Sequence, residues 1–247
     1  MNPQRILTII LKEWTQAFRT WSARLLVFLY PVVVTLLVIR LLAYLHSRMD
    51  PERIPAMLDY YLVIFMAMPL IGTAKVAVTG MMEDKAARSL EPLLVTPLTS
   101  GELLAGKILA AVTPATLVSW VAYGIFTTAM SHADFTQSPI FGSFHGMVWR
   151  VAIFVIAPLL AVLVAAIAFL ISSRTKDAPN AMNSCNEISA LITLLIFVGV
   201  GTAAYRHYAM PPGLLMEIAA GVVLLNVLTF LLCVKLFQRE TVLFKWK

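Results

Sequence analysis

Six long runs of apolar residues, separated by short polar segments, dominate the sequence. About 20 apolar residues in an α-helix cross the roughly 30 Å hydrocarbon layer of a bilayer, where isolated strands cannot satisfy their backbone hydrogen bonds. Each run reaches this length, so the pattern predicts an all-α membrane protein with six transmembrane helices in a single domain over residues 1–247. The predicted helices cover residues 25–45, 59–81, 103–130, 150–172, 187–205 and 214–237.

The composition supports the same class of protein. Apolar residues make up 60% of the chain and charged residues only 13%, whereas soluble domains carry about 25% charged residues. With a mean hydropathy of +0.85, the excess apolar surface has to face lipid. Six helices and short loops use up the 247 residues, so we expect no soluble catalytic or nucleotide-binding domain of ordinary size.

Lysine and arginine are divided unequally between the two sides of the predicted bundle. Thirteen fall on the side that holds both termini and five fall on the other. The positive-inside rule makes the first side cytoplasmic. The net charge of +6 is therefore mostly an orientation signal and does not indicate a nucleic-acid partner.

The first 22 residues predict an interfacial helix. Their apolar side chains fall on one helical face, opposite polar ones such as Lys12, and the two tryptophans on that face suit the membrane–water interface. We expect residues 1–22 to lie on the cytoplasmic leaflet in contact with membrane lipids. The apolar face consists of Ile6, Ile10, Trp14, Ala17, Phe18 and Trp21.

The longest predicted cytoplasmic loop, residues 82–106, mixes charged and apolar side chains. Glu83 and Asp84 suit the positive N-terminal end of a short helix, and prolines at 92 and 97 break the segment. A capping box, Thr99-Ser-Gly-Glu102, predicts the start of the third transmembrane helix. Apolar side chains among charges indicate a segment that docks onto another protein.

The stretch EDKAARSLEPLLVTPLTSGELLAGK, residues 83–107, resembles the segment after the second transmembrane helix of ABC-2-type transporter permeases. That family shows an acidic start, a Leu-Glu-Pro-Leu-Leu-x-Thr-Pro core and a Gly-Lys pair that enters the third helix. The triplet Lys-Glu-Trp at residues 12–14 and the run Ser-Ser-Arg-Thr-Lys-Asp at residues 172–177 agree with the resemblance. The resemblance to this family covers essentially the whole chain.

The resemblance implies the membrane-spanning subunit of an ATP-binding cassette exporter in a bacterial or archaeal inner membrane. Two permease copies would form the substrate pathway as a dimer. A separate ATPase subunit would bind ATP and Mg, so this chain would be non-catalytic, with no cofactor or metal of its own. The coupling segment would contact that ATPase through Glu83, Asp84, Lys85, Arg88, Leu90, Glu91, Pro92, Leu93, Leu94 and Thr96.

Polar residues inside the predicted helices are candidates for the substrate pathway. Thr113, Thr116 and Ser119 fall roughly on one stripe of the third helix, where they could line a pathway or simply pack. Asn226, with Thr229 one turn on, is the polar residue nearest a bilayer midplane. We expect helix–helix hydrogen bonding there first and substrate contact second.

Two other functions stay open. An ion-coupled secondary carrier would need an acid at mid-depth in the membrane, whereas Glu187 and the other acids of the runs are placed near helix ends. An intramembrane enzyme or a membrane-protein assembly factor should show convergent catalytic groups, and none is evident. Residues 101–107 fit the start of a phosphate-binding loop, but Ile108 stands where such a loop has Ser or Thr.

Overall fold

The structure, a computed structural model, describes residues 3–46, 54–86, 100–132, 146–175, 177–205 and 212–236. Within these ranges every regular element is a helix and no strand occurs. The turns η1 and η3 are π-helical and continue α2 into α3 and α8 into α9. The elements are α1 (Pro3–Ala17), α2 (Trp21–Arg24), η1 (Leu25–Leu29), α3 (Tyr30–His46), α4 (Ile54–Ala86), α6 (Ser100–His132), α8 (Met147–Val151), η3 (Ala152–Ile156), α9 (Ala157–Arg174), α10 (Ala178–Tyr205) and α11 (Pro212–Leu236).

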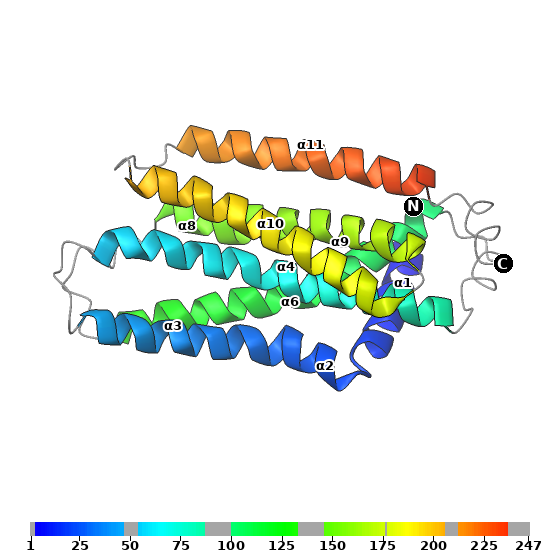
Figure 1. The fold of residues 1–247 in the computed structure, drawn as a ribbon, viewed down its shortest axis with the longest axis horizontal. Helices are drawn as coiled ribbons and strands as arrows, with labels where there is room; N and C mark the ends of the chain where they lie inside the picture. The colour runs from blue at the N-terminus through cyan, green and yellow to red at the C-terminus, as the bar shows by residue number, and fades with distance from the viewer. Residues whose placement is uncertain are drawn as a thin grey trace.

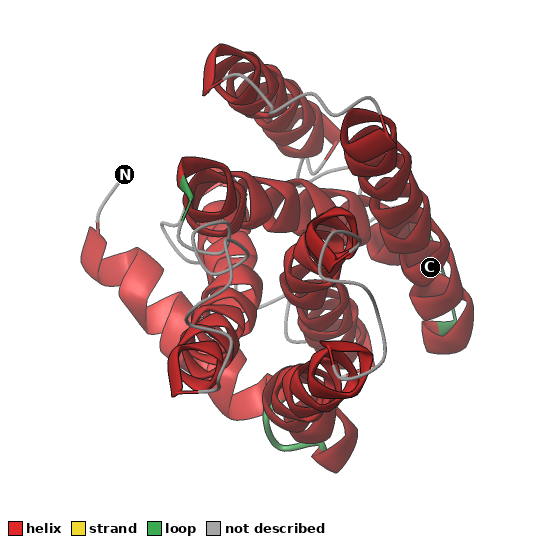
Figure 2. Ribbon diagram, turned by 90° about the vertical axis from the view of Figure 1, so that its left-hand side faces the viewer, coloured by secondary structure: helices red, strands yellow, loops and turns green. Residues whose placement is uncertain are grey.

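The described chain contains the expected six candidate crossings. They run alternately up and down along one axis (Figure 1), and the end-on view shows the described residues as a bundle of helices without strands (Figure 2). Their length and apolar character indicate a multi-pass membrane protein. The six segments are Trp21–Tyr44, Tyr61–Ala86, Gly101–Ser131, Met147–Arg174, Ala178–Gly199 and Met216–Lys235.

The helix α4 forms the centre of the bundle. It packs against α6, α9 and α10, and most of its side chains from Tyr61 onward are buried. The ring of Phe65 contacts those of Tyr123, Phe126 and Trp149, with centroids 5.0 to 6.4 Å apart. By contrast, α3, α10 and α11 expose many large apolar side chains, as expected of helices that face lipid.

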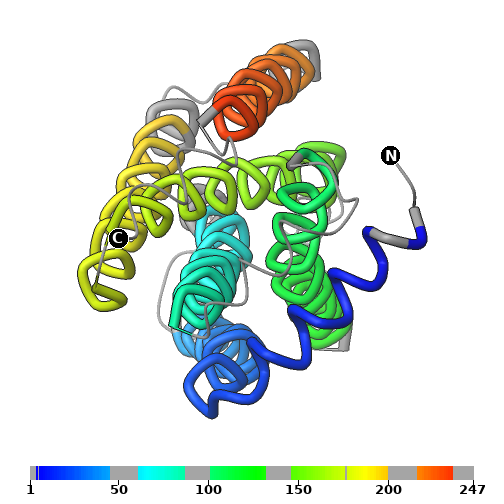
Figure 3. Tube along the Cα trace, turned by 90° about the vertical axis from the view of Figure 1, so that its right-hand side faces the viewer, coloured from blue at the N-terminus to red at the C-terminus, as the bar shows by residue number. Residues whose placement is uncertain are grey.

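The helix α1 is not aligned with the bundle. It crosses one end of the bundle at a steep angle and packs on α6 and α4 (Figure 3). We call this end the α1 end. Residues 18–20 separate α1 from α2, so the single interfacial helix predicted for residues 1–22 is in fact two helices with a corner between them. The rings of Phe18 and Phe28, 5.1 Å apart, pack together at that corner.

Two predicted helices, at residues 187–205 and 59–81, extend five or more residues beyond a predicted end. α10 begins at Ala178, nine residues before the predicted start, because the polar stretch 180–187 continues the helix along α4 and does not form a loop. Glu187 consequently lies inside the candidate span Ala178–Gly199 and not near its end.

The helix α4 continues to Ala86, five residues beyond its predicted end at residue 81. Glu83 and Asp84 therefore lie at the C-terminal end of a long helix and not at the start of a short one. The reason is that neither glycine nor proline interrupts residues 81–86, so the helix has no local reason to end earlier. The predicted start of the third long helix is confirmed, since α6 begins at Ser100.

Candidate functional site

Four charged side chains meet at the α1 end, where α1, α4 and α6 come together. Lys107, in the second turn of α6, is 2% exposed, and its Nζ donates to Glu13 Oε1 of α1 at 2.6 Å and to Asp84 Oδ2 of α4. Lys12 Nζ donates to the other oxygen of Asp84 at 3.1 Å. We call Lys12, Glu13, Asp84 and Lys107 the charge cluster. Its two lysines and two carboxylates neutralise each other.

The charge cluster is deeply buried apart from Lys12. Glu13 is 4% exposed and Asp84 is fully buried, whereas the side chain of Lys12 is 37% exposed. Removing one partner of a buried pair leaves an uncompensated charge and costs about 3–5 kcal/mol. The charge cluster therefore forces α1, α4 and α6 to keep one relative position at this end, since any separation would strand a charge.

Two glycines allow α1 to approach this closely. A Cβ atom at Gly80 of α4 would lie 2.8 Å from Glu13 Oε2, and one at Gly106 of α6 would lie 2.8 Å from the Cγ2 of Ile9. Both distances are shorter than side chains tolerate. The backbone of α4 and of α6 is thus bare where the buried face of α1, formed by Ile9, Glu13 and Ala17, rests on it.

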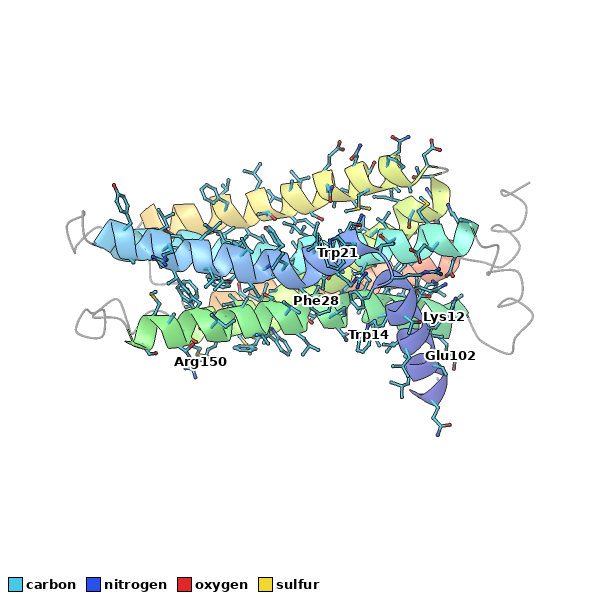
Figure 4. All side chains as sticks on the ribbon, turned by 90° about the horizontal axis from the view of Figure 1, so that it is seen from below. Lys12, Trp14, Trp21, Phe28, Glu102 and Arg150 are labelled. Carbon is cyan, nitrogen blue, oxygen red and sulfur yellow. The ribbon has the colours of Figure 1, made fainter. Side chains whose placement is uncertain are left out.

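A hydrogen bond from Trp14 completes the α1 contact. Its indole Nε1 donates to the carbonyl oxygen of Ala110 in α6 at 2.9 Å. In a regular helix that carbonyl would accept the amide of residue 114, but residue 114 is a proline without an amide hydrogen. Trp14 therefore satisfies a carbonyl that the sequence of α6 leaves without its usual donor. Figure 4 shows Trp14 and Lys12 on α1 where it crosses the bundle.

Lys85 joins the end of α4 to α9. Its Nζ donates to the carbonyl oxygens of Ser172, Ser173 and Thr175, the last two at 3.0 and 2.9 Å. The last carbonyls of a helix have no partner within it, and a cation suits the negative end of the helix dipole. Asp84 and Lys85 thus hold α6, α1 and α9 against the end of α4.

The predicted ATPase-coupling residues fall into two groups. Glu83, Asp84 and Lys85 lie in the last turns of α4, where Asp84 and Lys85 bind other parts of the same chain. Asp84 has no exposed surface, so it can affect a partner only indirectly. The others lie outside the described residues: Arg88, Leu90, Glu91, Pro92, Leu93, Leu94 and Thr96.

The candidate pathway residues are dispersed in the structure. The hydroxyl of Thr113 donates to Leu109 O, and that of Thr116 to Val112 O, both within α6. Ser119 is buried and donates to Phe65 O of α4 at 3.4 Å. These three hydroxyls therefore bond to backbone carbonyls, and only Ser119 reaches another helix.

Asn226 makes the helix–helix bond that was expected of it first. Its Nδ2 donates to Leu159 O of α9 and to Val222 O of its own helix, both at 2.9 Å. Its Oδ1 is buried and has no hydrogen-bond partner. Thr229, three residues further along α11, is partly buried.

Sequence reasoning missed Glu13 and Lys107 as a site. Glu13 was part of a family triplet and Lys107 part of a resemblance to a phosphate-binding loop, yet residues 101–107 are helical and the amine of Lys107 binds carboxylates. A usable signal was present: Glu13 lies one turn from Ile9 and one turn from Ala17, so an acid occupies an otherwise apolar helix face and needs a buried cation.

A scan of the chain against protein-family models gives no match, and a search of curated proteins finds no significant similarity. The described residues define a class no narrower than a multi-pass helical membrane protein with six candidate spans and a buried charge cluster at one end. Any more specific assignment has to come from the arrangement of its residues.

Proposed function

We propose that the chain is the membrane-spanning permease subunit of an ATP-driven exporter of the ABC-2 type. In this proposal two copies enclose the substrate pathway, and a separate ATPase subunit supplies the energy. The resemblance of residues 83–107 to the coupling region of such permeases supports the proposal. The six candidate spans of the described residues are consistent with such a subunit.

One structural observation carries the proposal furthest. Residues 87–99 connect the end of α4 to the start of α6 in the sequence, and the charge cluster joins these two helix ends to each other and to α1. A partner that pushes on this segment would therefore push on a rigid base of three helices. Motor-driven transport needs such a base, because a segment on loosely held helices would yield without moving them.

The proposal divides the coupling residues by role. Direct contact with the ATPase falls to residues 88–96 and to Glu83, which is partly exposed. Asp84 and Lys85 hold the base in place from inside the chain. In this orientation the α1 end is cytoplasmic, consistent with its excess of lysine and arginine.

Two substitutions in the coupling segment test the proposal. Glu91→Lys and Leu93→Asp should leave the protein inserted in the membrane but abolish its stimulation of ATP hydrolysis by a co-expressed candidate ATPase subunit. The matched control is Asn180→Asp, a charge change at an exposed residue of α10 near the same end. Full ATP-dependent transport by either coupling variant would refute the assignment of this segment.

The position of Glu187 favours a second function, an ion-coupled carrier. Glu187 lies nine residues into α10, roughly 14 Å along its axis, and is exposed in the single chain. Acids at depth in a membrane protein often serve proton or cation relays. If this function holds, Glu187→Gln abolishes uptake or efflux driven by an ion gradient in ATP-free vesicles. Under the first proposal, the unsubstituted protein already shows no transport in such vesicles, because it needs ATP.

A further inference from the structure

Each of the first four candidate spans contains a proline, at positions 31, 69, 114 and 158. A proline inside a helix removes one amide donor and leaves a carbonyl on the preceding turn unpaired. Inside a membrane such a carbonyl has no water to bind and costs free energy unless another donor reaches it. The donor that binds each unpaired carbonyl therefore shows how firmly the helix is fixed to its neighbours at that proline.

Three of the four sites are closed by a donor from another helix. Pro114 leaves Ala110 O, which Trp14 of α1 binds at 2.9 Å. Pro69 leaves Phe65 O, to which Ser119 of α6 donates at 3.4 Å. In both cases the unpaired carbonyl is the one four residues before the proline, and the donor ties two helices together.

The third site follows the same logic through a π-helical turn. In η3 the amide of Ala157 donates to Ala152 O, five residues back. The next carbonyl, that of Ile153, would need the amide of residue 158, which is proline. The indole Nε1 of Trp120, the neighbour of Ser119 on α6, donates to this carbonyl at 3.1 Å, and the ring of Trp120 packs on that of Phe154, 5.4 Å away.

The first span has the same π-helical turn before a proline, but among the described residues no side chain of another helix donates to the unpaired carbonyl. In η1 the amide of Tyr30 donates to Leu25 O, and residue 31 is proline, so Leu26 O has no donor along the helix. Unlike Ile153 O, it accepts no side-chain hydrogen bond within the part of the chain that the structure describes. The spacing from the π-turn to the proline is identical in the two spans, and only the donor differs.

Packing around η1 suits a pivot. Val27, its buried residue, lies against Gly72 of α4, whose bare backbone also lies close to Ala115 of α6. Beyond the turn, α3 contacts the bundle through one face, with Val38 and Leu42 each 4% exposed and Val34 and Ile39 partly buried beside them. Hydrophobic contact is non-directional, so this face does not fix the rotation of α3 in the way that hydrogen bonds to another helix would.

We propose that η1 is the working hinge of this fold: α3 pivots about it, while α4, α6 and the α8–η3–α9 span move as one locked body. The π-turn supplies the extra width that a bend requires, and π-turns and prolines are the usual sites of helix kinks. Rotation at η1 would displace the far end of α3 relative to α6. The inference rests on the hydrogen bonds and does not depend on the proposed function.

Distances between spin labels on the full chain in lipid nanodiscs test the hinge. With Cys185 and Cys233 replaced by Ala, one label pair at Tyr44 and Thr128 reports α3 against α6, and a second at Met147 and Thr128 reports the fourth span against α6. All three label sites are exposed. A pair at Val121 and Thr128, both exposed on α6, gives the width due to the labels alone. Diluting the labelled protein with an excess of unlabelled protein suppresses distances between labels on different copies.

The inference predicts a distance distribution for the α3 pair that is wider than the α6 baseline, and one for the Met147 pair that matches the baseline. Trp120→Phe should widen the Met147 pair, and Pro31→Ala, which restores an amide donor in the first span, should narrow the α3 pair. Baseline widths for both pairs in the unsubstituted chain would overturn the hinge, and so would equal broadening of both. The unsubstituted comparison decides even if either variant fails to fold.

Discussion

Lys107 is the residue on which the α1 end depends most. It is the one member of the charge cluster that contacts carboxylates from two other helices, and it is almost entirely buried. The cluster is neutral as a whole, so its stability comes from complete pairing and not from any single ion pair. Substitutions in it should therefore have unequal effects, graded by how many partners each leaves uncompensated.

Lys107→Met should lower the free energy of unfolding by about 3–5 kcal/mol, because it leaves Glu13 and half of the Asp84 pairing without a cation. Lys12→Met should cost no more than about 1 kcal/mol, since Lys12 is partly exposed and Asp84 keeps Lys107. Unfolding by titration with sodium dodecyl sulfate measures both. Equal losses for the two variants would show that burial does not control the energetics of the charge cluster.

Glycine substitutions in the bundle should have opposite signs. Gly80→Ala brings a Cβ to 2.8 Å from Glu13 Oε2, so Glu13 must shift away from Lys107 and the protein should be destabilised. Gly124→Ala meets nothing within 4 Å and should gain up to about 1 kcal/mol from the better helix propensity of alanine. The same titration, with trypsin cleavage after Lys12 as a probe of α1, checks the contrast. A stabilised Gly80→Ala variant would contradict the close packing of α1.

At the scale of elements, the sequence predicted the helices well but placed some of their ends wrongly. Hydrophobic run length located the six candidate spans of the described chain, because every helix that spans a bilayer needs about 20 apolar residues. The start of α10 was missed, because Asn180, Asn183 and Glu187 look like loop residues, whereas Ala181, Cys185 and Ser189 between and beyond them form a buried helix face. The bonds from Trp14 and Trp120 were likewise beyond prediction: the prolines reveal which carbonyls lack donors, but only the packing shows which side chain reaches them.

The bond between Trp14 and Ala110 O predicts a rescue. Trp14→Phe leaves that carbonyl without a donor and should cost about 1–3 kcal/mol. Adding Pro114→Ala supplies an amide at position 114, so the double variant should recover much of the loss. Trp21→Phe, at a tryptophan that is 65% exposed, is the control. Additive effects in the double-variant cycle would show that Trp14 contributes only by packing.

A substitution of Lys85 in α4 should have a local effect at the end of α9, far from it in the sequence. Lys85→Met removes the donor to the last carbonyls of α9, so amide hydrogen exchange should rise near residues 172–175 and stay unchanged at the other end of α9. Mass spectrometry of exchanged peptides measures it. Unchanged exchange at the end of α9 would mean that its carbonyls find other donors, such as water.

For the whole molecule, the described residues place their ion pairs at the α1 end. The charge cluster, Trp14 and Lys85 join α1, α4, α6 and α9 to each other there, whereas α3, α10 and α11 expose many large apolar side chains. Residues 87–99 connect two of the helices joined at this end. This is the arrangement expected if force enters through that segment and is converted into motion of helices further away.

The most direct test of the central claim is a photocrosslink from the coupling segment to its partner. A benzoylphenylalanine residue replaces Leu93 in the full chain, co-expressed with a candidate ATPase subunit, and the same residue replaces Asn180 as a control near the same end. The account predicts an ultraviolet-dependent adduct between position 93 and the ATPase, and none from position 180. An ATPase complex that transports substrate but gives no adduct from position 93 would contradict it.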